Sequence, residues 1–179
     1  MVIRVVADGP EVGEPTLESA WAALAEVADP EIPAITVVDL GLVHRVTVEP
    51  PGIGGSASRI AVELLPTFVG CPALDVLRDA VQQRLEALAP GAVVAVTFTF
   101  AEPWTSDRIT AAGREALRRS GFAPPLPGGA GLLQVLSPTA CPYCGSRRTR
   151  QDSAFGPTLC RSIHYCTACQ QPFEAFKAV

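Results

Sequence analysis

Two hydrophobic periodicities alternate along the first part of the chain. Apolar side chains at three- and four-residue steps predict three amphipathic helices, and alternation of apolar and polar side chains predicts three strands and a shorter extended segment. The helices are expected over residues 16–27, over 74–88 and through 109–117, the strands over 42–49, 60–65 and 93–100, and the extended segment over 35–38. The order α-β-β-α-β-α predicts a small α+β domain in which helices pack on a three-stranded sheet.

Proline and glycine mark the ends of this domain. Residues 7–15 combine Gly and Pro with acidic side chains, so a loose leader is expected there. Residues 123–131 are also rich in Pro and Gly, a composition unsuited to either regular element. We therefore divide the chain into a leader over 1–15, a domain over 16–122, a linker over 123–137 and a C-terminal domain over 138–179.

An acidic loop follows the first predicted helix. Asp29-Pro30-Glu31-Ile32-Pro33 ends that helix, because prolines push the residues before them toward extended geometry. The carboxylates of Asp29, Glu31 and Asp39 are candidate acids or metal ligands. Capping and turn formation are the simpler roles for each of them.

The charge distribution limits the partners that the chain is expected to have. The 179 residues carry a formal net charge of −4 and are 48% apolar, which supports a hydrophobic core and disfavours general nucleic-acid binding. Residues 1–137 hold 9 basic and 16 acidic side chains (−7), whereas residues 138–179 hold 5 and 2 (+3). The first residues lack a signal-peptide pattern, and no apolar run reaches membrane-spanning length. The sequence therefore predicts a cytoplasmic protein that binds neither nucleic acid nor membranes.

Cys71 lies where a predicted strand gives way to the helix over 74–88. Pro72 suits the first helical position, because its missing N–H would have no partner there, and Cys71 then lies at or beside the N-cap. The partial positive charge of a helix start favours the thiolate, the form that binds metals, although Asp75 and Asp79 act against this effect. Two interpretations follow: a reactive, metal-binding thiol, or a small cysteine that fills space in the core.

The other five cysteines fall within the last 39 residues. Cys141-Pro142-Tyr143-Cys144 and Cys166-Thr167-Ala168-Cys169 are two C-x-x-C pairs separated by 21 residues. Such turns aim four thiolates at one point, which predicts a tetrahedral metal site, with structural zinc favoured over iron. Metal binding would supply folding energy that so small a segment lacks. Cys160 and His164 are alternative ligands; otherwise Cys160 is expected in the hairpin core and His164 near the surface.

Four motifs in the first domain resemble those of the iron-sulfur cluster assembly (FSCA, MIP-type) domain family, over residues 16–122. They are Asp29-Pro30-Glu31-Ile32-Pro33, Val38-Asp39-Leu40-Gly41-Leu42-Val43, Thr67-x-x-x-Cys71-Pro72 and Pro103-Trp104-Thr105. Joined to the C-terminal ribbon, with Phe155-Gly156-x-x-x-Cys160 and Cys169-x-x-Pro172-Phe173, the whole chain is similar to the PaaD (PaaJ) family of phenylacetyl-CoA epoxidase subunits.

This resemblance implies a zinc ribbon after the α/β domain, and an accessory role in maturing a metal centre rather than oxidation of the substrate. In the wider family the cysteine that matches Cys71 is the functional thiol, and the acidic loop lies close to it. Cys71 is thus expected to bind a labile iron-sulfur cluster or iron, with Thr67, Asp29, Glu31 and Asp39 as neighbouring candidates. Because one cysteine cannot hold a cluster alone, a homodimer or a ligand from the ribbon would be needed.

Two functions are consistent with these features. The first is a maturation factor for the phenylacetyl-CoA epoxidase of phenylacetate breakdown, with its oxygenase or reductase subunit as the client. The second is a non-catalytic adaptor that binds the complex through the ribbon, where four arginines within residues 147–161 offer a basic face unless they are simply solvated. A thiol enzyme is disfavoured, because His44 shares the apolar face of its strand and neither it nor His164 lies in a motif that marks a base.

Overall fold

The computed structural model describes residues 14–52, 56–68, 71, 73–128 and 138–177. Four sequence predictions fall partly or wholly on other positions and lie outside the described residues. These are most of the leader, the tip of the glycine-rich loop between the first two strands, Pro72 at the helix start, and much of the linker.

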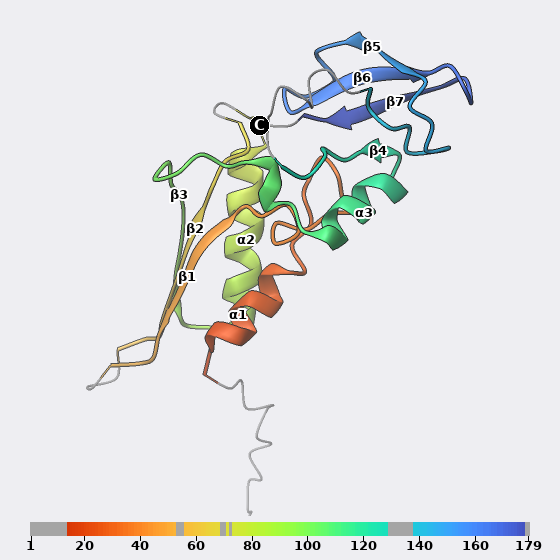
Figure 1. Cartoon of the computed structure of the whole chain (residues 1–179). Coiled ribbons are helices and arrows are strands. Elements are labelled where there is room, and N and C mark those ends of the chain that lie inside the picture. Colours follow the sequence, from red (N-terminus) through yellow and green to blue (C-terminus); the bar gives the residue numbers. More distant parts are fainter. Residues whose placement is uncertain (1–13, 53–55, 69–70, 72, 129–137, 178–179) are drawn as a thin grey trace, which may run out of the picture.

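The first part of the chain packs helices on a three-stranded sheet (Figure 1). Strands β1 and β2 are antiparallel, and α2 connects β2 to β3 as a parallel crossover, which gives the sheet order β1-β2-β3. The elements are α1 (Leu17–Leu24), β1 (Val43–Glu49), β2 (Arg59–Leu64), α2 (Leu74–Leu88), β3 (Val93–Phe98), a 3-10 turn (Ser106–Arg108) and α3 (Ala111–Arg119). The α+β fold class is therefore confirmed.

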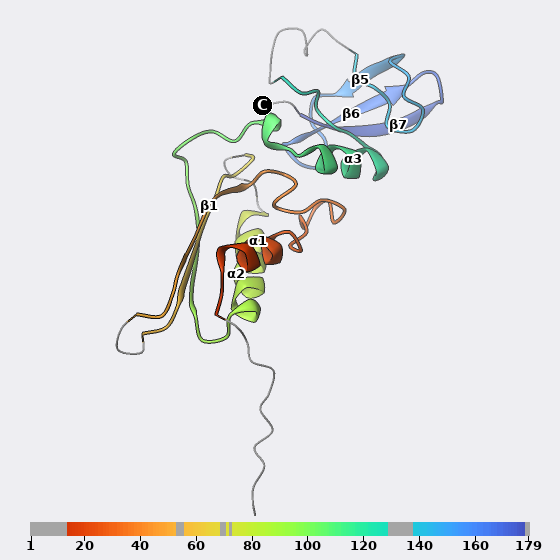
Figure 2. The same cartoon turned by 60° about the horizontal axis from the view of Figure 1, so that its bottom comes forward.

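The main core lies between the sheet and two helices. Helices α1 and α2 pack together on the same face of the sheet (Figures 1 and 2). Ile60 and Val62 of β2 share one buried cluster with Val81 and Leu85 of α2. Each such side chain contributes about 1.5–3 kcal/mol when it leaves water. The alternation in β2 and the helical repeat in α2 therefore both correspond to burial in this one core.

Helix α1 begins as expected and buries only part of its apolar stripe. Thr16 and Ser19 form a reciprocal capping box, in which each side chain accepts the backbone N–H of the other. The buried residues of α1 are Ala20, Ala23 and Leu24. Leu17 and Trp21, which share the helical repeat, are 50% and 37% exposed.

The expected extended segment over 35–38 is extended only around Thr36 and turns from Val37, so that prediction is wrong for its second half. Only Thr36 makes an isolated bridge, to Ala28, and the backbone then turns, with the Leu40 N–H donating to the Thr36 carbonyl at 2.9 Å. The Thr36 hydroxyl accepts the Asp39 N–H at 3.1 Å, a local bond that competes with strand pairing. The turn still buries alternate apolar side chains, which explains its strand-like pattern.

The chain beyond β3 departs from the sheet. The strand expected over 93–100 ends two residues early, and Phe100, which follows it, is 66% exposed. Trp104 is buried, and its Nε1–H donates to the Leu40 carbonyl at 2.9 Å. This bond ties the segment before α3 to the turn that precedes β1.

The C-terminal part forms a second sheet in the order β4-β7-β6-β5. Its strands are β4 (Phe122–Ala123), β5 (Thr149–Ser153), β6 (Arg161–Cys166) and β7 (Gln171–Phe176). Strands β5, β6 and β7 are antiparallel neighbours, whereas β4 comes from the chain leaving α3 and pairs in parallel with β7. The residues where the first domain meets the expected linker therefore extend the sheet of the ribbon.

The ribbon is also fixed to the first domain through its last strand. Phe176, at the end of β7, is 5% exposed and belongs to the main hydrophobic cluster of the first domain. Its ring centroid lies 6.0 Å from that of Trp104. The two parts consequently share a packed interface.

Among the helices that the structure describes, none combines the length and the apolar character needed to cross a membrane.

Candidate functional site

Four cysteines meet at one end of the ribbon, as their spacing predicts. The Sγ atoms of Cys141, Cys144, Cys166 and Cys169 all lie within 4.8 Å of one another, and the pairs Cys141–Cys169 and Cys144–Cys166 are each 3.7 Å apart. A regular tetrahedron with metal–sulfur bonds of about 2.3 Å places its sulfurs about 3.8 Å apart. The four side chains therefore fit a closed, four-thiolate metal-binding site.

The backbone around this group favours thiolates. Gly145 has φ +72°, a left-handed conformation, and its N–H donates to the Cys141 carbonyl at 2.9 Å. Backbone N–H groups of Cys169 and Ala168 lower the pKa of Cys166 to about 7. Burial, and hydrogen bonds shared with the neighbouring sulfurs, raise the pKa of Cys169 to about 12. A divalent cation bound among the four thiols would displace their protons.

Neither alternative ligand belongs to the four-cysteine group. His164 is only 7% exposed, its Nε2 lies 2.9 Å from the Ser162 hydroxyl, and its ring stacks on Phe173. The expectation that His164 lies near the surface is therefore wrong, and its burial lowers its pKa. Cys160 precedes β6 whereas Cys166 ends it, and six residues of extended chain separate them by about 20 Å.

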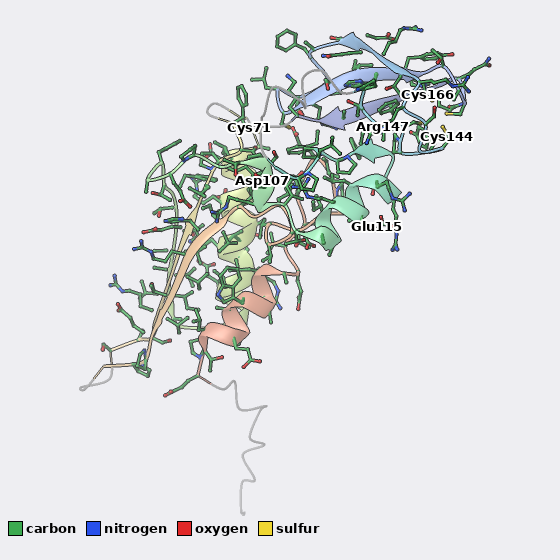
Figure 3. The ribbon with its side chains drawn as sticks, viewed as in Figure 1. Cys71, Asp107, Glu115, Cys144, Arg147 and Cys166 are labelled. Atoms are coloured by element: carbon green, nitrogen blue, oxygen red, sulfur yellow. The ribbon has the colours of Figure 1, made fainter. Side chains whose placement is uncertain are left out.

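Cys160 instead reaches a cavity at the junction of the two domains. This cavity of about 30 Å³ is lined by Cys71, Thr67, Asp29 and Glu31 from the first domain and by Cys160 and Phe176 from the ribbon. Figure 3 shows Cys71 on the side of the first domain that faces the ribbon, while Cys144 and Cys166 lie at the far end of the ribbon. The described cysteines therefore form two separate groups.

The acidic residues take different roles around the cavity. Asp29 Oδ1 accepts the N–H groups of Glu31 and Ile32 at 2.9 and 2.8 Å, which confirms a turn-forming role. Asp39 does not line the cavity; its Oδ1 accepts the Thr110 hydroxyl at 2.7 Å, at the N-cap of α3. Asp29 and Glu31 thus line the same cavity as Cys71, whereas Asp39 forms a hydrogen bond that caps α3.

Helix α2 begins later than expected. Its N-cap is Ala73, so Cys71 lies two residues before the cap rather than at or beside it. The Leu74 N–H donates to the Cys71 carbonyl at 3.3 Å, and the thiol is partly buried. The helix-start argument for Cys71 is therefore weaker than the sequence indicated, and the junction cavity is the stronger feature of its surroundings.

Arg161 is a site residue that the sequence did not identify. It was expected on a basic or solvated face, yet it is 7% exposed and contacts both domains. One guanidinium nitrogen lies 3.0 Å from Glu174 on β7 and another 3.6 Å from Glu31 in the acidic loop. Its Nε–H donates to the Thr158 hydroxyl, which lies 3.1 Å from the Cys160 sulfur. One feature of the sequence indicated this site: Cys160 is a fifth cysteine that a four-thiolate shell does not need.

Family comparisons match both halves of the chain. Residues 17–98 match the model of the iron-sulfur cluster assembly protein family, and residues 129–177 match that of the PaaD zinc beta ribbon domain. The chain is 34% identical over 171 residues, covering 94% of this chain and 96% of the relative, to a protein of Escherichia coli (strain K12) that is provisionally named as a 1,2-phenylacetyl-CoA epoxidase subunit.

Two further proteins resemble the first domain alone. A protein of Porphyromonas gingivalis (strain ATCC BAA-308 / W83) named Fe-S protein maturation auxiliary factor is 32% identical over 107 residues, covering 60% of this chain and 92% of the relative. The crystal structure of a domain of unknown function from Bacillus anthracis has a TM-score of 0.49 and 26% identity, covering 56% of this chain and 89% of that chain. From the matches to both halves and to the full-length relative, the chain belongs to the PaaD family, in which an iron-sulfur cluster assembly domain is joined to a zinc ribbon.

Proposed function

We propose that this protein is an accessory factor that helps to assemble an iron-sulfur or iron centre, with Cys71 as the ligand through which that centre is held in transit. The observation that carries the proposal is the position of Cys71 beside the acidic loop, in a cavity remote from the four-cysteine group. The names of the relatives, an epoxidase subunit and a maturation auxiliary factor, support the same role. A thiol in a small cavity can bind a metal centre and release it, whereas a closed four-thiolate shell holds its metal.

The four-cysteine site is assigned to structural zinc. The sulfur separations of 3.7 Å match a tetrahedral shell without an open position for substrate. The ribbon has a small buried cluster of its own, which includes Phe173 and Ala175 besides the cysteines, so the metal would supply much of its folding energy. On this proposal zinc holds the ribbon and takes no part in transfer.

The client is proposed to be the oxygenase or the reductase subunit of a phenylacetyl-CoA epoxidase. This part of the proposal is supported by the near full-length match to the Escherichia coli relative and by its name. The ribbon lies within the region that matches this relative and the PaaD zinc ribbon model. On this proposal the ribbon binds the epoxidase complex, while the first domain carries the metal centre.

Anaerobic reconstitution of the zinc-loaded protein with iron and sulfide tests the proposal. Cys71→Ser is expected to lower iron binding and transfer to the apo-client more than about tenfold, with zinc content unchanged. Val76→Ala, on an exposed position of the first turn of α2, is the matched control and should behave as the parent protein. Iron binding and transfer that do not depend on Cys71 would contradict the proposal.

A non-catalytic adaptor remains the second candidate. It is favoured by strand β5, which among the described strands lies at the edge of the ribbon sheet beside β6 and carries the exposed Arg150. Under this hypothesis Cys71→Ser keeps full epoxidase activity in cells, whereas Cys141→Ser abolishes it by unfolding the ribbon. The opposite pattern, in which Cys71→Ser alone abolishes activity, would exclude the adaptor.

A further inference from the structure

Cys160 is the described cysteine that neither the four-thiolate group nor the first domain's own motifs explain. It lies immediately before β6, and its thiol is partly buried against the main hydrophobic cluster of the first domain. The Lys177 N–H donates to the Cys160 carbonyl at 2.8 Å, and the Thr158 hydroxyl lies 3.1 Å from its sulfur. The backbone of Cys160 is therefore tied to the residue that follows β7, and its sulfur lies beside Thr158.

The same cavity is lined by Cys71 and Cys160, although 88 residues separate them in the sequence. A volume of about 30 Å³ is enough for one or two water molecules or a single metal ion. Two thiols of one chain thus line a space that fits one ion.

Charge in the cavity favours a cation once the thiols ionise. Burial raises the pKa of the Cys160 thiol, and the nearby Glu31 and Cys71 act in the same direction, whereas Thr158 and Arg161 act against it. A divalent cation reverses this balance, because thiolate coordination outweighs the loss of hydration and of the two protons.

We propose that Cys71 and Cys160 together bind one thiophilic divalent cation, of the Fe(II) class, in the junction cavity, with water completing its coordination. This inference rests on the proposed function and deepens it: the ribbon supplies the second thiolate that a single chain needs to hold iron before it is delivered. Binding forms two metal–sulfur bonds and releases the two thiol protons to solvent, with no change of oxidation state. Arg161 and Phe176 are positioning residues that bring Cys160 to Cys71.

Cobalt(II) alone is the probe, because its thiolate complexes absorb strongly and it resembles Fe(II) in ligand preference. Reduced, full-length protein with zinc already in the ribbon is titrated with Co(II) under anaerobic conditions. One Co(II) per chain is expected beyond the zinc, with a sulfur-to-cobalt charge-transfer band. Cys71→Ser and Cys160→Ser should each weaken Co(II) binding more than about tenfold. Leu159→Ala, at an exposed position next to Cys160, is the control and should leave binding unchanged.

A second measurement uses the unaltered chain, so it does not depend on the folding of a variant. Iodoacetamide alkylation, read peptide by peptide, should show that Co(II) protects Cys71 and Cys160 at the same concentration, while the four ribbon cysteines stay protected by zinc throughout. Protection of Cys71 alone would overturn the two-thiolate site and leave the proposed function standing. Protection of neither thiol, together with unimpaired iron transfer by Cys71→Ser, would overturn both. Cys71 and Cys160 could also form a disulfide before the titration. If the protein then binds no Co(II) after that disulfide has been reduced, the inference is contradicted.

Discussion

Replacing Phe176 by alanine tests whether the ribbon and the first domain form one packed unit. Phe176 ends β7, yet it is buried in the first domain's hydrophobic cluster beside Trp104. The substitution removes an aromatic side chain from the interface and leaves the four-cysteine group intact. Its effect should therefore fall on the docking of the ribbon and on the junction cavity, which Phe176 also lines.

The expected loss of folding free energy follows from the burial of Phe176. A Phe→Ala change at a fully buried position costs about 3–5 kcal/mol, the lost transfer free energy plus the cavity that remains. Binding of structural zinc contributes apparent free energies of about 10–16 kcal/mol, so the ribbon itself is expected to stay folded. A loss of about 3 kcal/mol corresponds to roughly a hundredfold increase in the open population, and Cys160 should then react with iodoacetamide up to about a hundred times faster.

The assay is urea unfolding at a fixed free zinc concentration, followed by metal analysis and by alkylation of Cys160. Phe100→Ala is the matched control, because Phe100 is 66% exposed, and its cost should stay within about 0.5 kcal/mol. A cost below about 1 kcal/mol for Phe176→Ala, with an unchanged alkylation rate at Cys160, would refute the argument that β7 anchors the ribbon.

Three further predictions concern single positions. Cys141→Ser should lower zinc content to less than about a tenth of that of the parent and remove the β-sheet signal of the ribbon in circular dichroism; retained zinc would argue against a four-thiolate site. Gly41→Ala should cost more than about 2 kcal/mol in urea unfolding, because Gly41 has φ +67° and an added Cβ would lie 2.4 Å from the Arg108 carbonyl oxygen; a cost below about 0.5 kcal/mol would contradict this. Burial raises the pKa of Cys160, so the fold favours its neutral thiol, and the stability gained from it is lost as pH rises through that raised pKa. Its alkylation rate should accordingly rise with a midpoint above that of a free thiol, about 8.5, and a lower midpoint would show that the thiol is not shielded.

Local patterns predicted most of the elements, because each such element is defined by burial along one face. The alternation of Ile60 and Val62 and the helical repeat of Val81 and Leu85 both describe contacts with the same core. The C-x-x-C spacing was equally informative, because each C-x-x-C turn directs two thiolates to one point, and two such turns together predict a four-thiolate metal site. In these cases the residues that carry the sequence pattern lie within a single helix, strand or turn.

Failures arose where a local bond outweighed the pattern. Residues 35–38 alternate like a strand, but the Thr36 hydroxyl accepts the Asp39 N–H and closes a turn. Leu17 and Trp21 repeat at a helical step, yet the buried side of α1 consists of Ala20, Ala23 and Leu24, and the two other side chains stay partly exposed. Periodicity gives the spacing of apolar side chains but not the partner surface that covers them.

The junction site could not be predicted from either domain alone. Strand β6 keeps Cys160 away from the four-cysteine group, but whether Cys160 reaches Cys71 depends on how the ribbon docks, and docking depends on Phe176 and on the ion pair of Arg161 with Glu31. That ion pair joins the acidic loop to a residue 130 positions later in the chain. No local pattern encodes such a pairing.

The four-cysteine site lies at the opposite end of β6 from Cys160, so a metal bound there can fix the position of Cys160 through the strand. A one-residue slip of β6 against β7 would turn every side chain of β6 to the opposite face, and would carry Cys160 away from the cavity. A metal bound by Cys166 and Cys169 closes the turn between these strands and therefore fixes their register. Zinc about 20 Å away would thus determine whether Cys160 reaches Cys71, without any contact between the two thiol groups.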